Sequence, residues 1–149
     1  MAAPAWAVGA SATGTFNVGV TLTSKCEINS TNGASGAAIT ALPIAYTSFQ
    51  TAASAGYTSF GVRCTKDQSY SLALDNASVT DGVTGLAYTL NLSTANTPSS
   101  TANASVGSQT GTGLAAITYY VNANMVSGQD GTVLTTGTPN STRTLTITY

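Results

Sequence analysis

The sequence predicts an all-β protein built as a β-sandwich, and three observations support that prediction. Short runs of alternating apolar and polar residues recur along the chain, turn-forming pairs such as Asn-Gly and Asp-Gly separate them, and no long stretch has the 3.6-residue period of a helix. The 149 residues show no compositional break that marks a second domain. This length is enough to bury the core of a single domain.

The first alternating stretch is GTFNVGVTLTSKCEI, residues 14–28, which predicts a half-buried strand. Further strands are predicted over 58–65, 69–75, 86–92, 115–126 and 143–149. The polar stretch 93–113 between them predicts a long exposed loop, with a twisted edge hairpin as the alternative. The apolar faces of the strands supply the candidate groove and core residues: Phe60, Val62, Tyr70, Leu72, Leu74, Leu145, Ile147 and Tyr149.

The composition disfavours catalysis, metal binding, nucleic-acid binding and insertion in a membrane. The chain has no histidine, a single glutamate and four aspartates that lie in or beside predicted turns, so we expect no catalytic residues, no metal site and no cofactor. Four basic residues are too few to neutralise a nucleic-acid backbone. No apolar run is long enough for a membrane span, so we do not expect the protein to be embedded in a membrane. Only 6% of the residues are charged, so either hydroxyl and amide groups keep the protein in solution or it associates.

Two cysteines, Cys26 and Cys64, lie on the same face as the apolar residues of their predicted strands. In an exported protein this arrangement predicts one buried disulfide that closes a loop of 38 residues. By the chain-entropy estimate such a loop contributes about 3.5 to 4 kcal/mol to stability. Two separate buried thiols, or a redox or metal pair, are the alternatives.

Taken in order along the chain, these features resemble a known family. An alternating N-terminal strand runs into SKCEI, VRCTKDQSYSLAL surrounds the second cysteine, LAYTLNL follows, and TLTITY stands at the end of the sequence. This order resembles the spore coat protein U family, which includes the pilin subunits of archaic, Csu-type chaperone–usher pili.

The resemblance implies an immunoglobulin-like β-sandwich that is incomplete in the monomer and completed by a donor strand from the neighbouring subunit. Residues 1–23 are then an N-terminal extension, with the donor strand over about 13–22, and residues 24–149 are the pilin domain. The inward face of the donor strand consists of Phe16, Val18, Val20 and Leu22. The implied partners are identical subunits in a head-to-tail fibre and, during assembly, a periplasmic chaperone and an outer-membrane usher.

The function implied is that of a structural subunit of an extracellular fimbria, exported through the periplasm and supporting adhesion and biofilm formation. Small-residue patterns at 5–7 and 8–10 are of the kind that signal peptidase cuts after, with an ordinary Ala-rich tail as the alternative. Two other functions stay open: a protective coat component of the same family, and a self-contained sandwich that binds carbohydrate. Candidate contacts for the carbohydrate are Trp6, Tyr46, Tyr57, Tyr119 and Tyr120.

Overall fold

The computed structural model describes residues 1, 9, 11–32, 36–132 and 141–149, and these residues form strands without any helix. The all-β prediction is therefore confirmed. Two antiparallel sheets are present, one of six strands in the order β2-β1-β3-β8-β6-β5 and one of three in the order β7-β4-β9. The strand bounds are β1 Cys26–Ile28, β2 Thr31–Asn32, β3 Ser54–Cys64, β4 Ser69–Leu74, β5 Ser78–Thr80, β6 Ala87–Ser93, β7 Ser105–Thr110, β8 Ile117–Met125 and β9 Leu145–Thr148.

One apolar core lies between the two sheets, because alternate residues of each strand point inward. Phe60 of β3 stacks on Tyr119 of β8 with ring centroids 5.9 Å apart. The Tyr119 hydroxyl lies 2.9 Å from that of Tyr70 on β4, so a buried hydrogen bond joins the two sheets. Burial, followed by this hydrogen bond, raises the pKa of Tyr119. Leu72 of β4 is buried in the same core.

The stretch 93–113 differs from the predicted loop in its second half. Residues 105–110 form β7, which pairs with β4 at the edge of the small sheet, with Leu72 opposite Val106. Val106 is the only apolar side chain of β7 that packs on the core, so the strand carries too weak an apolar alternation to be recognised. The prediction of a single long loop is wrong there, and an edge strand, part of the alternative, is present.

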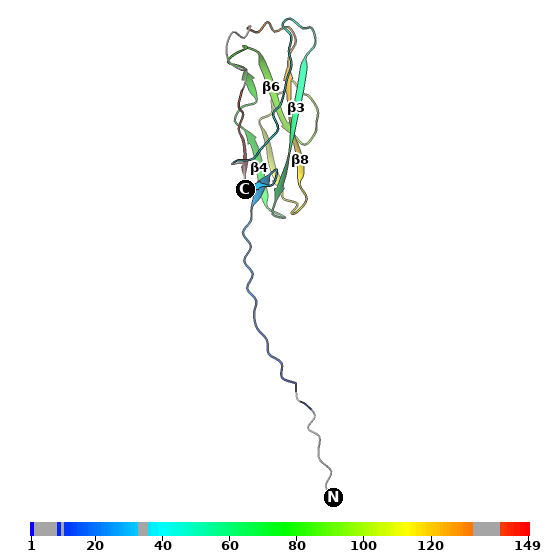
Figure 1. The fold of residues 1–149 in the computed structure, drawn as a ribbon, viewed down its shortest axis with the longest axis vertical. Helices are drawn as coiled ribbons and strands as arrows, with labels where there is room; N and C mark the ends of the chain where they lie inside the picture. The colour runs from blue at the N-terminus through cyan, green and yellow to red at the C-terminus, as the bar shows by residue number, and fades with distance from the viewer. Residues whose placement is uncertain (2–8, 10, 33–35, 133–140) are drawn as a thin grey trace.

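Figure 1 shows an elongated body with a long tail that leaves one end of it. The body extends along β3 and β8, which pair from Ser54↔Met125 at one end to Val62↔Ile117 near the other. The tail joins β1 beside Cys64, so it leaves at the second of these ends, where the C-terminus also lies. We call this the tail end, and the end at Ser54 and Met125 the far end. No described helix has the length and apolar character needed to cross a membrane.

Cys26 and Cys64 form a disulfide between β1 and β3, where they are directly opposite each other in the register. Both side chains are buried, with 0% and 2% exposure. This confirms the predicted disulfide and indicates that the chain folds in a non-reducing compartment, as an exported protein does. The bond fixes the point at which the tail joins the body.

Removal of the disulfide will destabilise the body. The double variant Cys26→Ala/Cys64→Ala is expected to lower the free energy of unfolding by about 2 to 5 kcal/mol, because the unfolded chain regains the freedom that the closed loop removes. Chemical denaturation followed by intrinsic fluorescence measures this change. An unfolding midpoint equal to that of the unreduced protein would show that β1 is held by packing alone.

Candidate functional site

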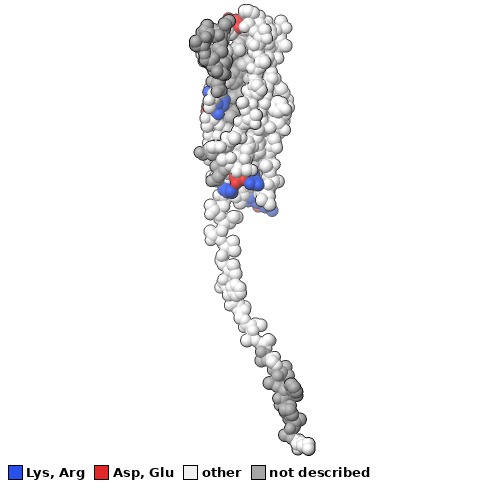
Figure 2. Space-filling view, in the orientation of Figure 1, with Lys and Arg blue, Asp and Glu red and all other residues white. Residues whose placement is uncertain are grey.

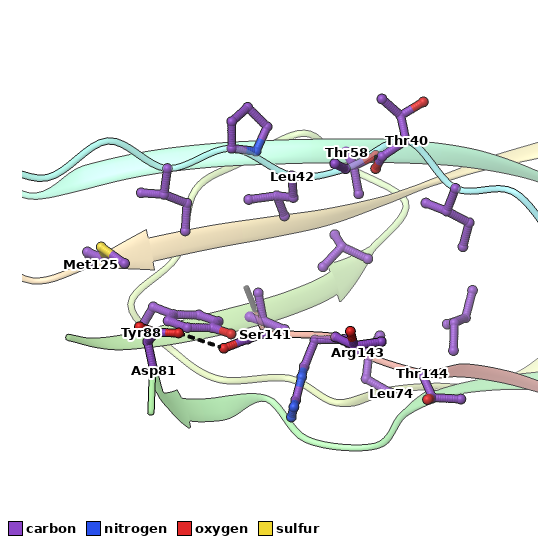
Figure 3. A pocket seen from close by; sticks show the side chains of 18 of the residues that line it. Thr40, Leu42, Thr58, Leu74, Asp81, Tyr88, Met125, Ser141, Arg143 and Thr144 are labelled. Atoms are coloured by element: carbon purple, nitrogen blue, oxygen red, sulfur yellow. Dashed lines mark hydrogen bonds between the residues drawn. The ribbon is translucent and has the colours of Figure 1, made fainter. Parts of the chain in front are cut away.

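A groove of about 820 Å³ opens along one side of the body, between the two sheets. Figure 3 shows side chains pointing into it from two opposite walls. One wall is the segment 37–46 and the other runs from Ser141 to Leu145 at the start of β9. Core residues of both sheets form its floor: Ile28, Leu74, Leu90, Val121 and Met125. The groove is therefore an opening in the apolar core itself.

The first wall, residues 37–46, lies against β3 without forming a strand with it. The Thr58 hydroxyl donates to the Thr40 carbonyl at 2.7 Å. Gly56 allows the wall to approach closely, because a Cβ at that position would stand 2.4 Å from the Pro43 carbonyl oxygen. Alternate apolar residues of the wall pack on the core from this position: Ala37, Ile39, Leu42 and Ile44.

The second wall offers main-chain hydrogen-bonding groups as well as apolar side chains. β9 pairs with β4 on one side, and no other described strand pairs with it. The Thr144 carbonyl accepts from the Asp75 N–H at 2.9 Å, so the even-numbered residues of this strand face β4. By the alternation of an antiparallel ladder, Leu145 and Ile147 direct their N–H and C=O groups to the open edge. Their side chains are nevertheless buried, with 9% and 8% exposure.

At the far end the groove has a polar mouth. Asp81 is 7% exposed, and its Oδ1 accepts from the Ser141 hydroxyl at 3.1 Å, a bond drawn in Figure 3. Its Oδ2 accepts from the Thr84 hydroxyl and the Thr84 N–H, both at 2.7 Å. These bonds, those of Thr84 first, hold the pKa of Asp81 below its ordinary value although burial opposes them. Tyr46 lies at the same mouth and accepts from the Gln129 N–H at 2.9 Å.

The tail is the second half of the candidate site. Residues 11–25 are extended and form no described strand. The four predicted donor residues are all exposed there, Phe16 by 86%, Val18 by 73%, Val20 by 88% and Leu22 by 78%. Four apolar side chains in strict alternation on one exposed segment form an unpaired strand face, which isolated monomers avoid.

The root of the tail is held firmly to the body. Lys25 donates its N–H to the Thr65 hydroxyl at 3.0 Å, and its carbonyl accepts from the Thr65 N–H at 2.9 Å. Glu27 lies between two cations, 2.6 Å from Lys25 Nζ and 2.5 Å from Arg63 Nη2. The hydrogen bonds from Lys25 and Arg63 lower the pKa of Glu27. Between this anchor and the apolar face of the tail stand only Thr23 and Ser24.

The predicted groove and core residues lie where expected with one exception. Seven of them are buried: Phe60, Val62, Tyr70, Leu72, Leu74, Leu145 and Ile147. Tyr149 follows the end of β9 and is 49% exposed, so it does not belong to the core.

The wall 37–46 was not predicted as part of the site. Its apolar residues skip a position between Ile39 and Leu42, and Pro43 interrupts the run, so the alternation is hidden.

The tyrosines considered for carbohydrate binding do not gather on one surface. Tyr57 and Tyr120 form a tilted pair on the outer face of the large sheet, with centroids 6.2 Å apart. Tyr119 is fully buried in the core, and Tyr46 lies at the groove mouth. Trp6 lies outside the described residues.

Comparisons with protein-family models, with curated proteins and with solved structures found no match to this chain. Within the described residues, no group of three or more His, Cys, Asp or Glu side chains is placed to hold a metal ion. The groove and the tail are therefore the features on which a function can be argued.

Gly56 sets the position of the first groove wall, so its substitution will disturb the groove. We expect Gly56→Ala to lower the melting temperature, because the added Cβ has to push the Pro43 main chain away from β3. Gly107→Ala on β7 is the matched control, since a Cβ there meets nothing within 4 Å. Equal melting temperatures for the two variants would show that the wall moves without cost.

Asp81 makes the groove mouth sensitive to acid. Its folded-state pKa lies below the ordinary value of 3.8, so its contribution is present above that value and is lost as the pH falls toward the folded-state pKa. We expect Asp81→Asn to lower the melting temperature at pH 7 and to reduce the loss of stability between about pH 4 and pH 2. Asp67→Asn, in a turn at the tail end, is the control. An unchanged pH profile for Asp81→Asn would contradict this role.

Proposed function

We propose that this protein is a structural subunit of an extracellular filament, in which the tail of one copy fills the groove of the next. The observation that carries the proposal is the complementarity within one chain. An open groove in the apolar core has an unpaired strand edge, and an exposed tail has the alternation that such a groove requires. Strand addition of this kind satisfies main-chain groups and buries alternate side chains together.

The chemistry of the two surfaces supports this pairing. A strand laid beside β9 would accept and donate hydrogen bonds with the open-edge groups of Leu145 and Ile147, and its inward residues would meet the groove floor. Burial of the four exposed side chains of the tail would contribute roughly 6 to 12 kcal/mol, before the cost of ordering the tail. The inserted strand would complete an immunoglobulin-like sandwich, as the resemblance to pilins of the spore coat protein U family implies.

The placement of the tail supports an open fibre rather than a closed dimer. β4 begins near Thr65 at the tail end, and β9 runs antiparallel to it, so β9 ends at the tail end. A tail that continues away from its own body enters the next copy from the far end and runs antiparallel to β9. Because the donated tail and the receiving groove are different surfaces, the contact is heterologous, and it builds an open filament unless its rotation closes a ring.

In this proposal the chain is not an enzyme. Its partners are identical subunits, with a periplasmic chaperone and an outer-membrane usher during export, and the outcome is adhesion and biofilm formation. A protective coat would use the same strand exchange.

Two variants of the full chain that differ by one position will test the strand exchange. Val18→Asp places a charge on the inward face of the tail, and we expect it to abolish heat-resistant ladders on a gel and fibres in electron micrographs. Asn17→Asp places the same charge on the outward face and should leave assembly intact. Equal assembly by the two variants would contradict the proposal.

The Val18→Asp protein also serves as an acceptor with an unfilled groove. A peptide with the native sequence of residues 11–24 is expected to raise its melting temperature, since binding to the folded state alone stabilises it. The same peptide with Val18→Asp is the control. A melting temperature that neither peptide changes would show that the groove does not take a strand.

A further inference from the structure

The far end of the body carries an exposed aromatic side chain on a strained turn. Phe49 is 73% exposed and has a φ of 63°, a left-handed conformation that a bulky residue rarely adopts. The turn is nevertheless well held. The Phe49 N–H donates to the Gln129 carbonyl at 2.8 Å, the Gly128 N–H donates to the Gln50 carbonyl at 2.9 Å, and the Ser48 hydroxyl donates to the Asp130 carbonyl at 2.5 Å. Strain that the surroundings maintain is a reason to look for a function.

The opposite end, where the tail leaves, carries a hollow of about 320 Å³. Leu114, 91% exposed, lies on its edge. Its lining includes three of the four basic residues of the chain, Lys25, Arg63 and Lys66, together with Glu27. Glu27 is ion-paired with Lys25 and Arg63, so the lining carries a net charge of +2, and Lys66 is the cation without an ion pair to Glu27. In the view of Figure 2 blue atoms lie on both sides of a red patch at this end of the body, and further red atoms lie at the other end.

The two ends are complementary in chemistry. An aromatic ring is attracted to cations that lie over its face, and its edge packs on an aliphatic side chain such as Leu114. Asp130, exposed on the segment that holds the Phe49 turn, adds a negative charge beside the ring. The far end thus presents an aromatic ring and a carboxylate. The tail end presents a hollow with Leu114, the cation Lys66 and an ion-paired cluster that keeps one net positive charge.

The length of the tail root brings these ends together. If Leu22 lies in the groove of the next copy, only Thr23 and Ser24 separate it from Lys25, which is bonded to Thr65 of its own body. Three Cα steps span about 11 Å at most. The groove mouth at Tyr46 is tied through Gln129 to the Phe49 turn, so the tail of one copy passes beside Phe49 of the next.

We propose a second contact between successive copies of this chain, in which Phe49 of one copy inserts into the hollow at Leu114, Lys25 and Lys66 of the copy whose tail it receives. This inference rests on the proposed strand exchange and adds to it. The donated strand holds the copies together, and the end-to-end contact sets the angle between them and stiffens the filament. The charges at this contact make the stiffness fall as salt is added.

A disulfide trap in the full chain tests the contact directly. Phe49→Cys combined with Leu114→Cys is expected to give covalent ladders after mild oxidation of assembled fibres, and reducing agent should abolish them. Tyr57→Cys combined with Leu114→Cys is the control, because Tyr57 is exposed on the outer face of the large sheet and should give no ladder. Covalent ladders in the control alone, or in neither variant, would overturn the contact.

Phe49→Asn gives a measurement without new cysteines. Asparagine accepts the left-handed conformation, so this variant keeps the turn and removes the ring. We expect this variant to form fibres and its subunit to keep the melting temperature of the unmodified protein. Its fibres should have a shorter persistence length in electron micrographs. Tyr57→Asn is the control, and its fibres should keep the persistence length of the unmodified protein. Fibres of equal stiffness would overturn the end contact and leave the strand exchange standing. Failure of the unmodified chain to polymerise would instead overturn the strand exchange and, with it, the contact.

Discussion

The structure depends on an edge of β9 with which no described strand pairs. β9 is paired on one side with β4, while the main-chain groups of Leu145 and Ile147 point away from it toward the groove. The side chains of Leu145 and Ile147 belong to the core. A polar loop laid over this edge would therefore leave the apolar side chains of the groove uncovered. The disulfide, the inter-sheet hydrogen bond and the pairing of β3 with β8 form the rest of the body, and all of them leave this opening in place.

Most of the strands could be predicted because their alternation is dictated by one buried face. β4, β6, β8 and β9 carry apolar residues at every second position, as does β3 from Phe60 onward, and the two cysteines follow the same pattern. β7 was missed because only Val106 among its side chains packs on the core. The groove wall at 37–46 was missed for a different reason. Its course depends on the close approach that Gly56 allows, a tertiary contact that local periodicity does not report.

The tail illustrates a limit of periodicity as a signal. The alternation over residues 14–28 predicts one continuous strand, yet only residues 26–28 pair with β3. Alternation tells which face of a strand is apolar, but it does not tell which molecule supplies the core that buries this face. The geometry at Lys25 shows where the body begins, because the main chain is bonded to Thr65 there and the preceding residues leave the body.

The connectivity of the chain favours the proposed filling of a neighbour's groove over closure of its own. To enter its own groove, the tail would have to reverse direction within Thr23 and Ser24 and would then run parallel to β9. A parallel ladder is slightly less stable per residue than an antiparallel one. A tail that continues straight needs no reversal, and in the proposed filament it runs antiparallel to β9 of the next copy. In the proposed filament the same short root brings the ends of successive copies close to each other.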